Sequence, residues 1–213
     1  MDRWATFDCY GTLIDWNGGI GRELERLFGA ARSGESLRAY HAVEPQIQRE
    51  DPSRSYREVM TVALARLGAP AGEQDALGRS LPKWDPFPEV PAALEDARSH
   101  GWRLAVLSNT DGDLLETSLE RIGVDFDLTV VASEIGSYKP APTHWNEFFA
   151  RSGAESERHV HVGASLFHDI APALALGLRT IWVNRLGEDA EPQPDVELHS
   201  LTGLSEGLDS LVP

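Results

Sequence analysis

Several residues whose types could do chemistry follow short apolar runs of the kind that form buried strands. They are a carboxylate, hydroxyl and amide groups, a lysine and a second carboxylate, in the segments Asp8 to Thr12, Ser108-Asn109, Ser137-Tyr138-Lys139-Pro140 and Ser165 to Asp169. A carboxylate beside an ammonium group stays ionised and can act as a nucleophile. If the four segments converge on one cleft, they predict covalent catalysis by a carboxylate.

The elements that would carry these residues alternate between strand and helix. RWATF is a short buried strand, and Gly11 follows it as a turn signal. After Pro88, strand-like runs such as WRLAVLS and RTIWV alternate with helical segments. Such alternation is typical of a parallel sheet with helices on both faces, where ligands bind beyond the carboxyl ends of the strands.

The segment from about Trp16 to Leu81 differs, because its apolar residues recur at spacings of three and four. Ser36 and Ser55 are predicted helix N-caps within it. We therefore predict an α/β fold: a Rossmann-like parallel sheet core with an inserted helical cap domain. The core would comprise residues 1–14 and 88–213, and the cap residues 15–87.

Composition narrows the range of partners. The chain has 213 residues, 41% of them hydrophobic, and 19 basic against 34 acidic residues give a net charge of −15. That charge argues against nucleic acid and anionic membrane as partners, and no stretch reaches the ~20 apolar residues of a spanning helix. Cys9 is the only cysteine, so no intrachain disulfide is expected. A soluble cytoplasmic protein is expected, with a homodimer left open.

The motifs FDCYGTLID, LAVLSNT, SYKP and HVGASLFHDIAPALALG resemble, in order and spacing, the four motifs of the haloacid dehalogenase superfamily. The resemblance covers essentially the whole chain. Phosphatases of that superfamily have a second Asp where this chain has Tyr10, and an acidic residue where it has Ala164. The pattern FD-x-YGT instead resembles the 2-haloacid dehalogenase branch. The resemblance therefore implies a hydrolase acting on carbon–halide bonds, with no metal and no cofactor.

The resemblance also assigns roles. Asp8 would attack the carbon bearing the halogen of a small anionic organic substrate and form an ester, with Thr12 and Lys139 supporting its charge. Asp169 would position the hydrolytic water. Arg38 would bind the halide, an exposed helix arginine being the alternative reading. The expected substrate-binding residues are Tyr10, Ser108, Asn109, Trp145, Ser165 and His168.

Two further hypotheses remain open. One is a phosphatase-like hydrolase of the same superfamily, which magnesium dependence would distinguish. The other is a non-catalytic small-anion-binding protein with this fold. His159 and His161 alternate with Val160 and could suggest a metal site, but no third ligand is in register, so we interpret them as a packed pair.

Overall fold

The computed structural model describes residues 2–213 and contains a six-stranded parallel sheet in the order β3-β2-β1-β4-β5-β6. The strands are β1 (Arg3–Phe7), β2 (Trp102–Ser108), β3 (Leu128–Val131), β4 (His159–Gly163), β5 (Arg179–Val183) and β6 (Val196–Leu198). β1 lies between β2 and β4. The chain adds β2 and β3 on one side of β1 and then β4, β5 and β6 on the other side, so the strand order reverses at β1. The carboxyl end of this strand is therefore the expected ligand site.

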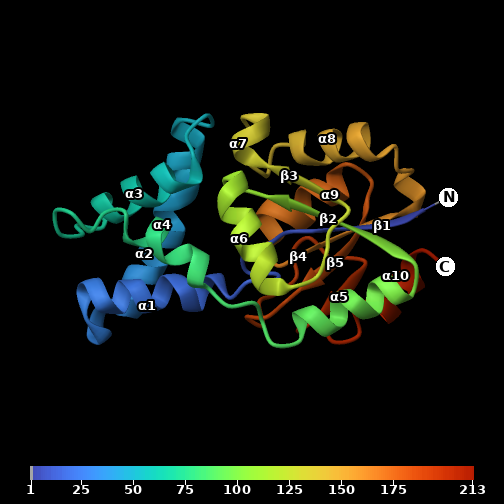
Figure 1. Cartoon of the computed structure of the whole chain (residues 1–213), viewed down its shortest axis with the longest axis horizontal. Coiled ribbons are helices and arrows are strands. Elements are labelled where there is room, and N and C mark those ends of the chain that lie inside the picture. The colour runs from blue at the N-terminus through green and yellow to red at the C-terminus, as the bar shows by residue number, and fades with distance from the viewer. Residues whose placement is uncertain (1) are drawn as a thin grey trace.

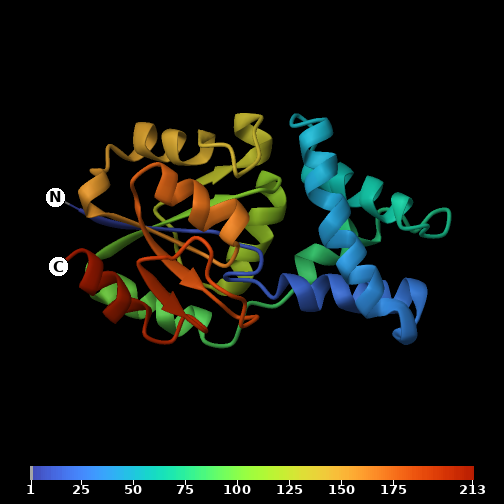
Figure 2. The same cartoon turned by 180° about the vertical axis from the view of Figure 1, so that it is seen from behind.

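Helices cover both faces of the sheet (Figures 1 and 2). Alternate residues of β2 point to opposite faces, with Ala105 and Leu107 in one buried cluster and Leu104 and Val106 in the other. The first cluster lies under α8 (Thr143–Ser152) and α9 (Ala171–Ala175). The second includes α5 (Val90–Ser99), α6 (Gly112–Ile122) and α10 (Leu204–Leu211). Short helical turns complete this part: α7 (Ala132–Ile135), η2 (Ser156–Arg158) and the π-helical η3 (Leu166–Ile170).

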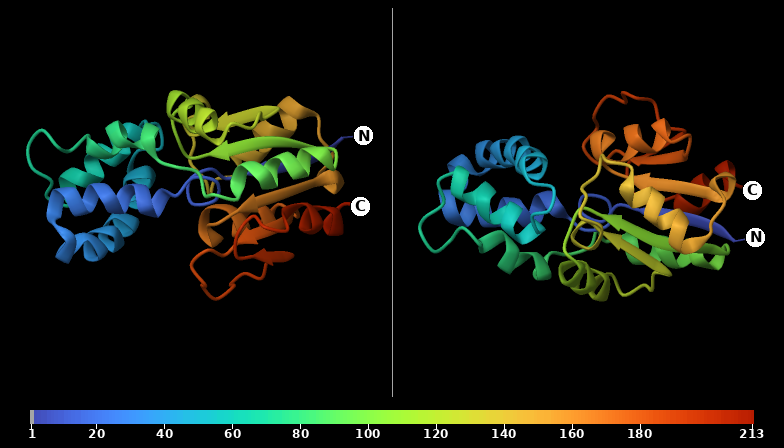
Figure 3. Two further views of the ribbon diagram at one scale, coloured as in Figure 1. Left: turned by 60° about the horizontal axis from the view of Figure 1, so that its bottom comes forward. Right: turned by 90° about the horizontal axis from the view of Figure 1, so that it is seen from above.

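The remaining helices form a separate lobe beyond the carboxyl ends of the strands, opposite the two chain termini (Figures 1 and 3). They are α1 (Trp16–Phe28), α2 (Ala30–Glu50), α3 (Tyr56–Arg66), α4 (Ala76–Ser80) and η1 (Leu81–Lys83); this lobe is called the cap below. None of the helices within residues 2–213 is long and apolar enough to cross a membrane.

Two connecting segments join the cap to the sheet, and they pair with each other. Asp15 N donates to Asp85 O at 2.9 Å, and Phe87 N donates to Leu13 O at 3.0 Å. Arg185, after β5, stacks on Phe87 at 3.6 Å and donates to Thr12 O at 2.9 Å. The connectors therefore form one hydrogen-bonded unit held against the sheet.

A second contact between cap and core uses the N-terminus of α3. Ser55 is its N-cap and forms a capping box with Glu58. Asp111, which follows β2, accepts the free backbone N–H groups of Tyr56 and Arg57 at 2.8 and 3.0 Å. A core carboxylate thus satisfies donors that a helix start leaves unpaired, and this orients the cap over the sheet.

The expected alternation of strands and helices matches the structure, with local differences. The prediction for Ser55 is confirmed. That for Ser36 is wrong, since Ser36 is buried inside α2, which begins six residues earlier at Ala30. β6 was not predicted, because its three residues carry only a weak apolar signal beside an acidic loop.

The packing of α1 yields a paired test of the fold. A Cβ on Gly19 would lie 2.3 Å from Trp84 Cδ2, whereas one on Gly21 would meet nothing within 4 Å. We expect Gly19→Ala to lower the free energy of unfolding by about 1–3 kcal/mol. Gly21→Ala should raise it by about 0.5–1 kcal/mol through helix propensity. Urea denaturation of both variants measures this, and equal effects would contradict the described packing.

Candidate active site

Asp8 lies directly after β1 at the centre of the sheet edge, where its N–H donates to Val162 O at 3.0 Å. The chain then turns at Gly11, whose φ of 99° favours glycine. The turn brings Thr12 back, so that its hydroxyl donates to Asp8 Oδ2 at 3.0 Å and accepts from Ala164 N at 2.9 Å. Thr12 therefore fixes the Asp8 carboxylate and ties it to the loop after β4.

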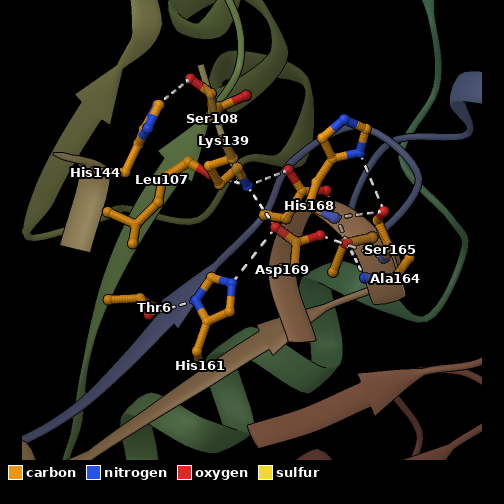
Figure 4. Close-up of polar contacts among 12 residues, drawn as sticks. Thr6, Leu107, Ser108, Lys139, His144, His161, Ala164, Ser165, His168 and Asp169 are labelled. Atoms are coloured by element: carbon orange, nitrogen blue, oxygen red, sulfur yellow. Dashed lines mark hydrogen bonds and ion pairs between the residues drawn. The ribbon is translucent and has the colours of Figure 1, made fainter. Parts of the chain in front are cut away.

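Lys139 is 1% exposed, and its ammonium group lies between two carboxylates. Nζ donates to Asp8 Oδ1 at 2.9 Å, to Asp169 Oδ1 at 2.6 Å and to Leu107 O at 2.8 Å. Figure 4 shows Lys139 between Leu107 and Asp169 near the ends of the strands. All three ammonium protons have acceptors, so the buried charge is fully hydrogen-bonded.

Asn109 fixes the backbone of Lys139. Its side-chain oxygen accepts from Lys139 N at 2.6 Å, and its amide nitrogen donates to Lys139 O at 3.0 Å. The neighbouring Ser108 hydroxyl is buried and has no hydrogen-bond partner. Ser108 thus has a free donor at the site, while the Asn109 side chain is already used to position the lysine.

Asp169 lies in η3, against the end of β4. Ser165 N donates to Asp169 Oδ2 at 3.3 Å. A Cβ on Gly163 would lie 2.5 Å from Asp169 Cβ, so only glycine leaves room for the carboxylate there. The residue type at position 163 is therefore dictated by this close approach.

Behind Asp169 lies a buried row of polar side chains on neighbouring strands (Figure 4). Thr6 Oγ1 is 2.8 Å from both His159 Nε2 and His161 Nδ1, and His161 Nε2 is 3.5 Å from Asp169 Oδ1. Burial lowers the pKa of both histidines, so they are neutral. They form the packed pair expected from the sequence, linked here by a threonine.

The three ionisable groups at the centre of the site differ in how the protein shifts their pKa values. Burial raises the pKa of Asp8 to about 6, although Lys139 opposes this rise. Burial also acts to raise the pKa of Asp169, but Lys139 and His161 outweigh it and hold that pKa well below its usual range. For Lys139, burial acts to lower the pKa, and the two carboxylates raise it overall. Asp169 and Lys139 therefore stay ionised, whereas Asp8 titrates in weak acid.

A cavity of about 420 Å³ opens between this sheet edge and the cap. The core wall includes Asp8, Tyr10, Ser108, Asn109, Lys139, Ser165, His168 and Asp169. The cap wall consists of Trp16 and Asn17 from α1, His41, Glu44, Pro45 and Gln48 from α2, and Tyr56 from α3. Eight of the eleven residues predicted for the site therefore line one cavity. Thr12 does not line it but donates a hydrogen bond to Asp8, which does.

Arg38 and Trp145 lie elsewhere. The buried face of α2 carries Ser36, Tyr40 and Glu44. Arg38 is two residues from Ser36, so it faces the opposite side of the helix and is exposed. Trp145 is fully buried beneath the sheet edge, with its ring 5.0 Å from that of His161. The structure thus does not bring either residue to the cavity.

Four charged residues of the cavity were not among the predicted site residues: Asp15, Glu44, Arg185 and Glu188. Arg185 follows β5, so the rule about strand ends applied to it as well. It pairs with Glu89 at 2.7 Å and binds the connectors. Glu44, which is 6% exposed, places a carboxyl group on the buried face of α2. A polar residue in phase with Tyr40 and Gln48 was the signal for it.

The donor set does not favour a metal ion. Among residues 2–213, no group of three or more His, Cys, Asp or Glu side chains could hold one. Oδ1 of Asp8 and Oδ1 of Asp169 both accept hydrogen bonds from Lys139. Magnesium prefers several oxygen ligands, and an ammonium group already fills this position.

Comparison with known proteins adds independent findings. A family model described as haloacid dehalogenase-like hydrolase matches residues 3–177. The (S)-2-haloacid dehalogenase 4A of Burkholderia cepacia is 26% identical, over 96% of this chain and 92% of that protein. The phosphoserine phosphatase of Thermus thermophilus is 31% identical, over 70% of this chain and 61% of that protein.

Among solved structures, that of an L-2-haloacid dehalogenase superposes with a TM-score of 0.86 at 24% identity. The match covers 98% of this chain and 99% of that one, so the whole fold is shared, including the cap.

The electrostatics of the site can be tested by titration. Since Lys139 lowers the pKa of Asp8, we expect Lys139→Met to raise that pKa above about 6, as followed by ¹³C NMR of labelled aspartate. Arg185→Met is the matched control, because Arg185 also lines the cavity but pairs with Glu89. An unchanged Asp8 pKa in Lys139→Met would contradict the assigned coupling.

Proposed function

The chain belongs to the haloacid dehalogenase-like hydrolase family, and we propose that it is a hydrolytic dehalogenase of small 2-haloacids working through an aspartyl ester. The observation that carries this proposal is the Asp8 carboxylate, held by Thr12 and Lys139 at the floor of the cavity. The full-length similarity to an (S)-2-haloacid dehalogenase supports it.

In the first step, an Asp8 oxygen attacks the carbon that bears the halogen. A carbon–oxygen bond forms, the carbon–halogen bond breaks, and the halide leaves with the bonding electrons. The carboxylate must be ionised for this attack, so activity should fall as the pH drops through about 6, the pKa of Asp8. Lys139 keeps Asp8 ionised and offsets the charge of the substrate carboxylate.

In the second step, water attacks the aspartyl carbonyl carbon and releases a 2-hydroxy acid. Asp169 stays ionised and is proposed to accept a hydrogen bond from this water. The free Ser108 hydroxyl is proposed to hold the substrate carboxylate. Tyr10, Ser165 and His168 line the cavity as further substrate contacts.

Tyr10 argues against the phosphatase hypothesis. A phosphatase of this family would need an acid at this position to protonate its leaving group. The Tyr10 hydroxyl instead lies 2.9 Å from Ser118 Oγ, and burial raises its pKa well above the usual range. Tyr10 therefore cannot serve as a proton donor and acceptor near neutral pH.

The cytoplasmic location and the homodimer stay predictions.

The nucleophile can be tested directly. We expect Asp8→Asn to lower kcat for halide release from 2-bromopropionate at least about 10³-fold, because an amide is a poor nucleophile. A single turnover of the unaltered enzyme in H₂¹⁸O should place ¹⁸O in the peptide containing Asp8, as seen by mass spectrometry. Label found only in the 2-hydroxy acid would contradict the ester.

Metal independence is a separate prediction. Halide release should be unchanged, within about twofold, after treatment with EDTA and without added metal, since an ammonium group occupies the position between the carboxylates. Activity that disappears with EDTA and returns with Mg²⁺, together with turnover of an aryl phosphate, would favour the phosphatase hypothesis.

A further inference from the structure

The cap wall of the cavity lies opposite the nucleophile and has an unusual composition. An atom displaced from carbon departs on the side opposite to the attacking oxygen, so a group expelled by Asp8 moves away from the core wall. It moves toward residues of α1, α2 and α3. A departing anion is stabilised by hydrogen-bond donors placed where its charge develops, and here the cap must supply them.

The cap wall supplies no cation. The cavity residues contributed by α1, α2 and α3 include no Arg or Lys. Arg38, the sequence-based candidate, is exposed on the other side of α2. The cationic residues of the cavity, Lys139 and Arg185, belong to the core and are paired with carboxylates.

The cap wall instead carries Glu44 among neutral donors. Glu44 is 6% exposed and lines the cavity. Trp16 Nε1 donates to the Tyr56 hydroxyl at 3.0 Å, which leaves the Tyr56 proton free to donate. The hydroxyl of Tyr40, which lies on α2 like Glu44, is buried without a hydrogen-bond partner. Glu44 thus lies in a polar patch that faces Asp8 across the cavity.

We infer, on the basis of the proposed function, that Glu44 receives the leaving atom as a neutral carboxylic acid and donates a hydrogen bond to it. In this step the Asp8 oxygen bonds to carbon, the halogen leaves with the bonding electrons, and the proton stays on Glu44. A hydrogen bond from a carboxylic acid stabilises a leaving anion more when that anion is a stronger hydrogen-bond acceptor. The cavity is therefore suited to fluoroacids, since fluoride is a stronger acceptor than chloride or bromide.

The surroundings of Glu44 favour the neutral form. Burial is the main cause that raises its pKa to about 7; the hydrogen bond from Tyr56 opposes this rise, and the charge of Asp8 adds to it. The titratable groups that interact electrostatically with Glu44 are Tyr40, Tyr56, Tyr138 and Asp8. None of them is a cation. His41 and Lys139 line the same cavity, but burial keeps His41 neutral and Lys139 is bound by two carboxylates.

A test compares halide release from fluoroacetate and bromoacetate by the full-length protein. We expect Glu44→Leu to lower kcat/KM for fluoroacetate at least tenfold more than for bromoacetate. Glu44→Gln, which keeps a neutral donor, should retain most of the fluoride release. Glu35→Gln is the matched control, because Glu35 is an exposed glutamate on the same helix, and it should change neither rate.

The pH profile gives a second readout that a purely structural role would not produce. Glu44 must be protonated, so fluoride release should fall as the pH rises through about 7. This fall should be absent for bromoacetate and for Glu44→Gln. The Gln variant also keeps the inference testable if Glu44→Leu does not fold.

The outcomes separate the inference from the function on which it rests. Bromide release with an unchanged fluoride-to-bromide ratio in Glu44→Leu and no alkaline fall would overturn the role of Glu44. Bromide release without fluoride release by the unaltered enzyme would overturn the substrate class. Release of no halide from either acid would overturn the proposed dehalogenase activity itself.

Discussion

The ammonium group of Lys139 is buried between Asp8 and Asp169, and the rest of the site is arranged around it. A buried charge is strongly destabilising unless its hydrogen bonds are complete. Three acceptors complete them here, and one of these is the backbone oxygen of Leu107 in β2. Asn109 holds the lysine backbone from the same strand end. The position of one nitrogen atom therefore depends on three segments distant in sequence and is fixed by the sheet.

Charge is divided between the two parts of the molecule. The core contributes the lysine and both carboxylates, and these groups carry a net negative charge before any substrate binds. The cap covers them with one tyrosine, one tryptophan, two amides, a histidine, a proline and one buried glutamate. The Asp111 contact with the start of α3 fixes this cover in place. The charged groups that act on the substrate are thus held by the sheet, whereas the cap helices supply the residues that shape the opposite wall of the cavity and its hydrogen-bonding groups.

The sequence predicts the fold and the core of the site well, because both depend on short-range patterns. Strand periodicity and the rule about strand ends are sufficient to bring Asp8, Lys139 and Asp169 together. The cap was harder to predict. The structure places Arg38 away from the cavity because of its position around α2. Predicting that position requires the start of α2 and its buried face, and the capping prediction at Ser36 misplaced that start. The burial of Trp145 and the use of Asn109 to hold Lys139 depend on tertiary packing that no local pattern reveals.

The position of β1 in the middle of the sheet has a consequence for how the chain folds. Its two neighbours begin at Trp102 and His159, so this five-residue strand has no strand partner until about half of the chain has been synthesised, and its second partner follows after about three quarters of it. The helices of the cap contact one another over short sequence separations and can form early. During synthesis, β1 remains an unpaired apolar segment next to a folded helical unit, and such segments are prone to aggregation. The strand that ends in the nucleophile is thus protected only by strands that are synthesised much later than itself.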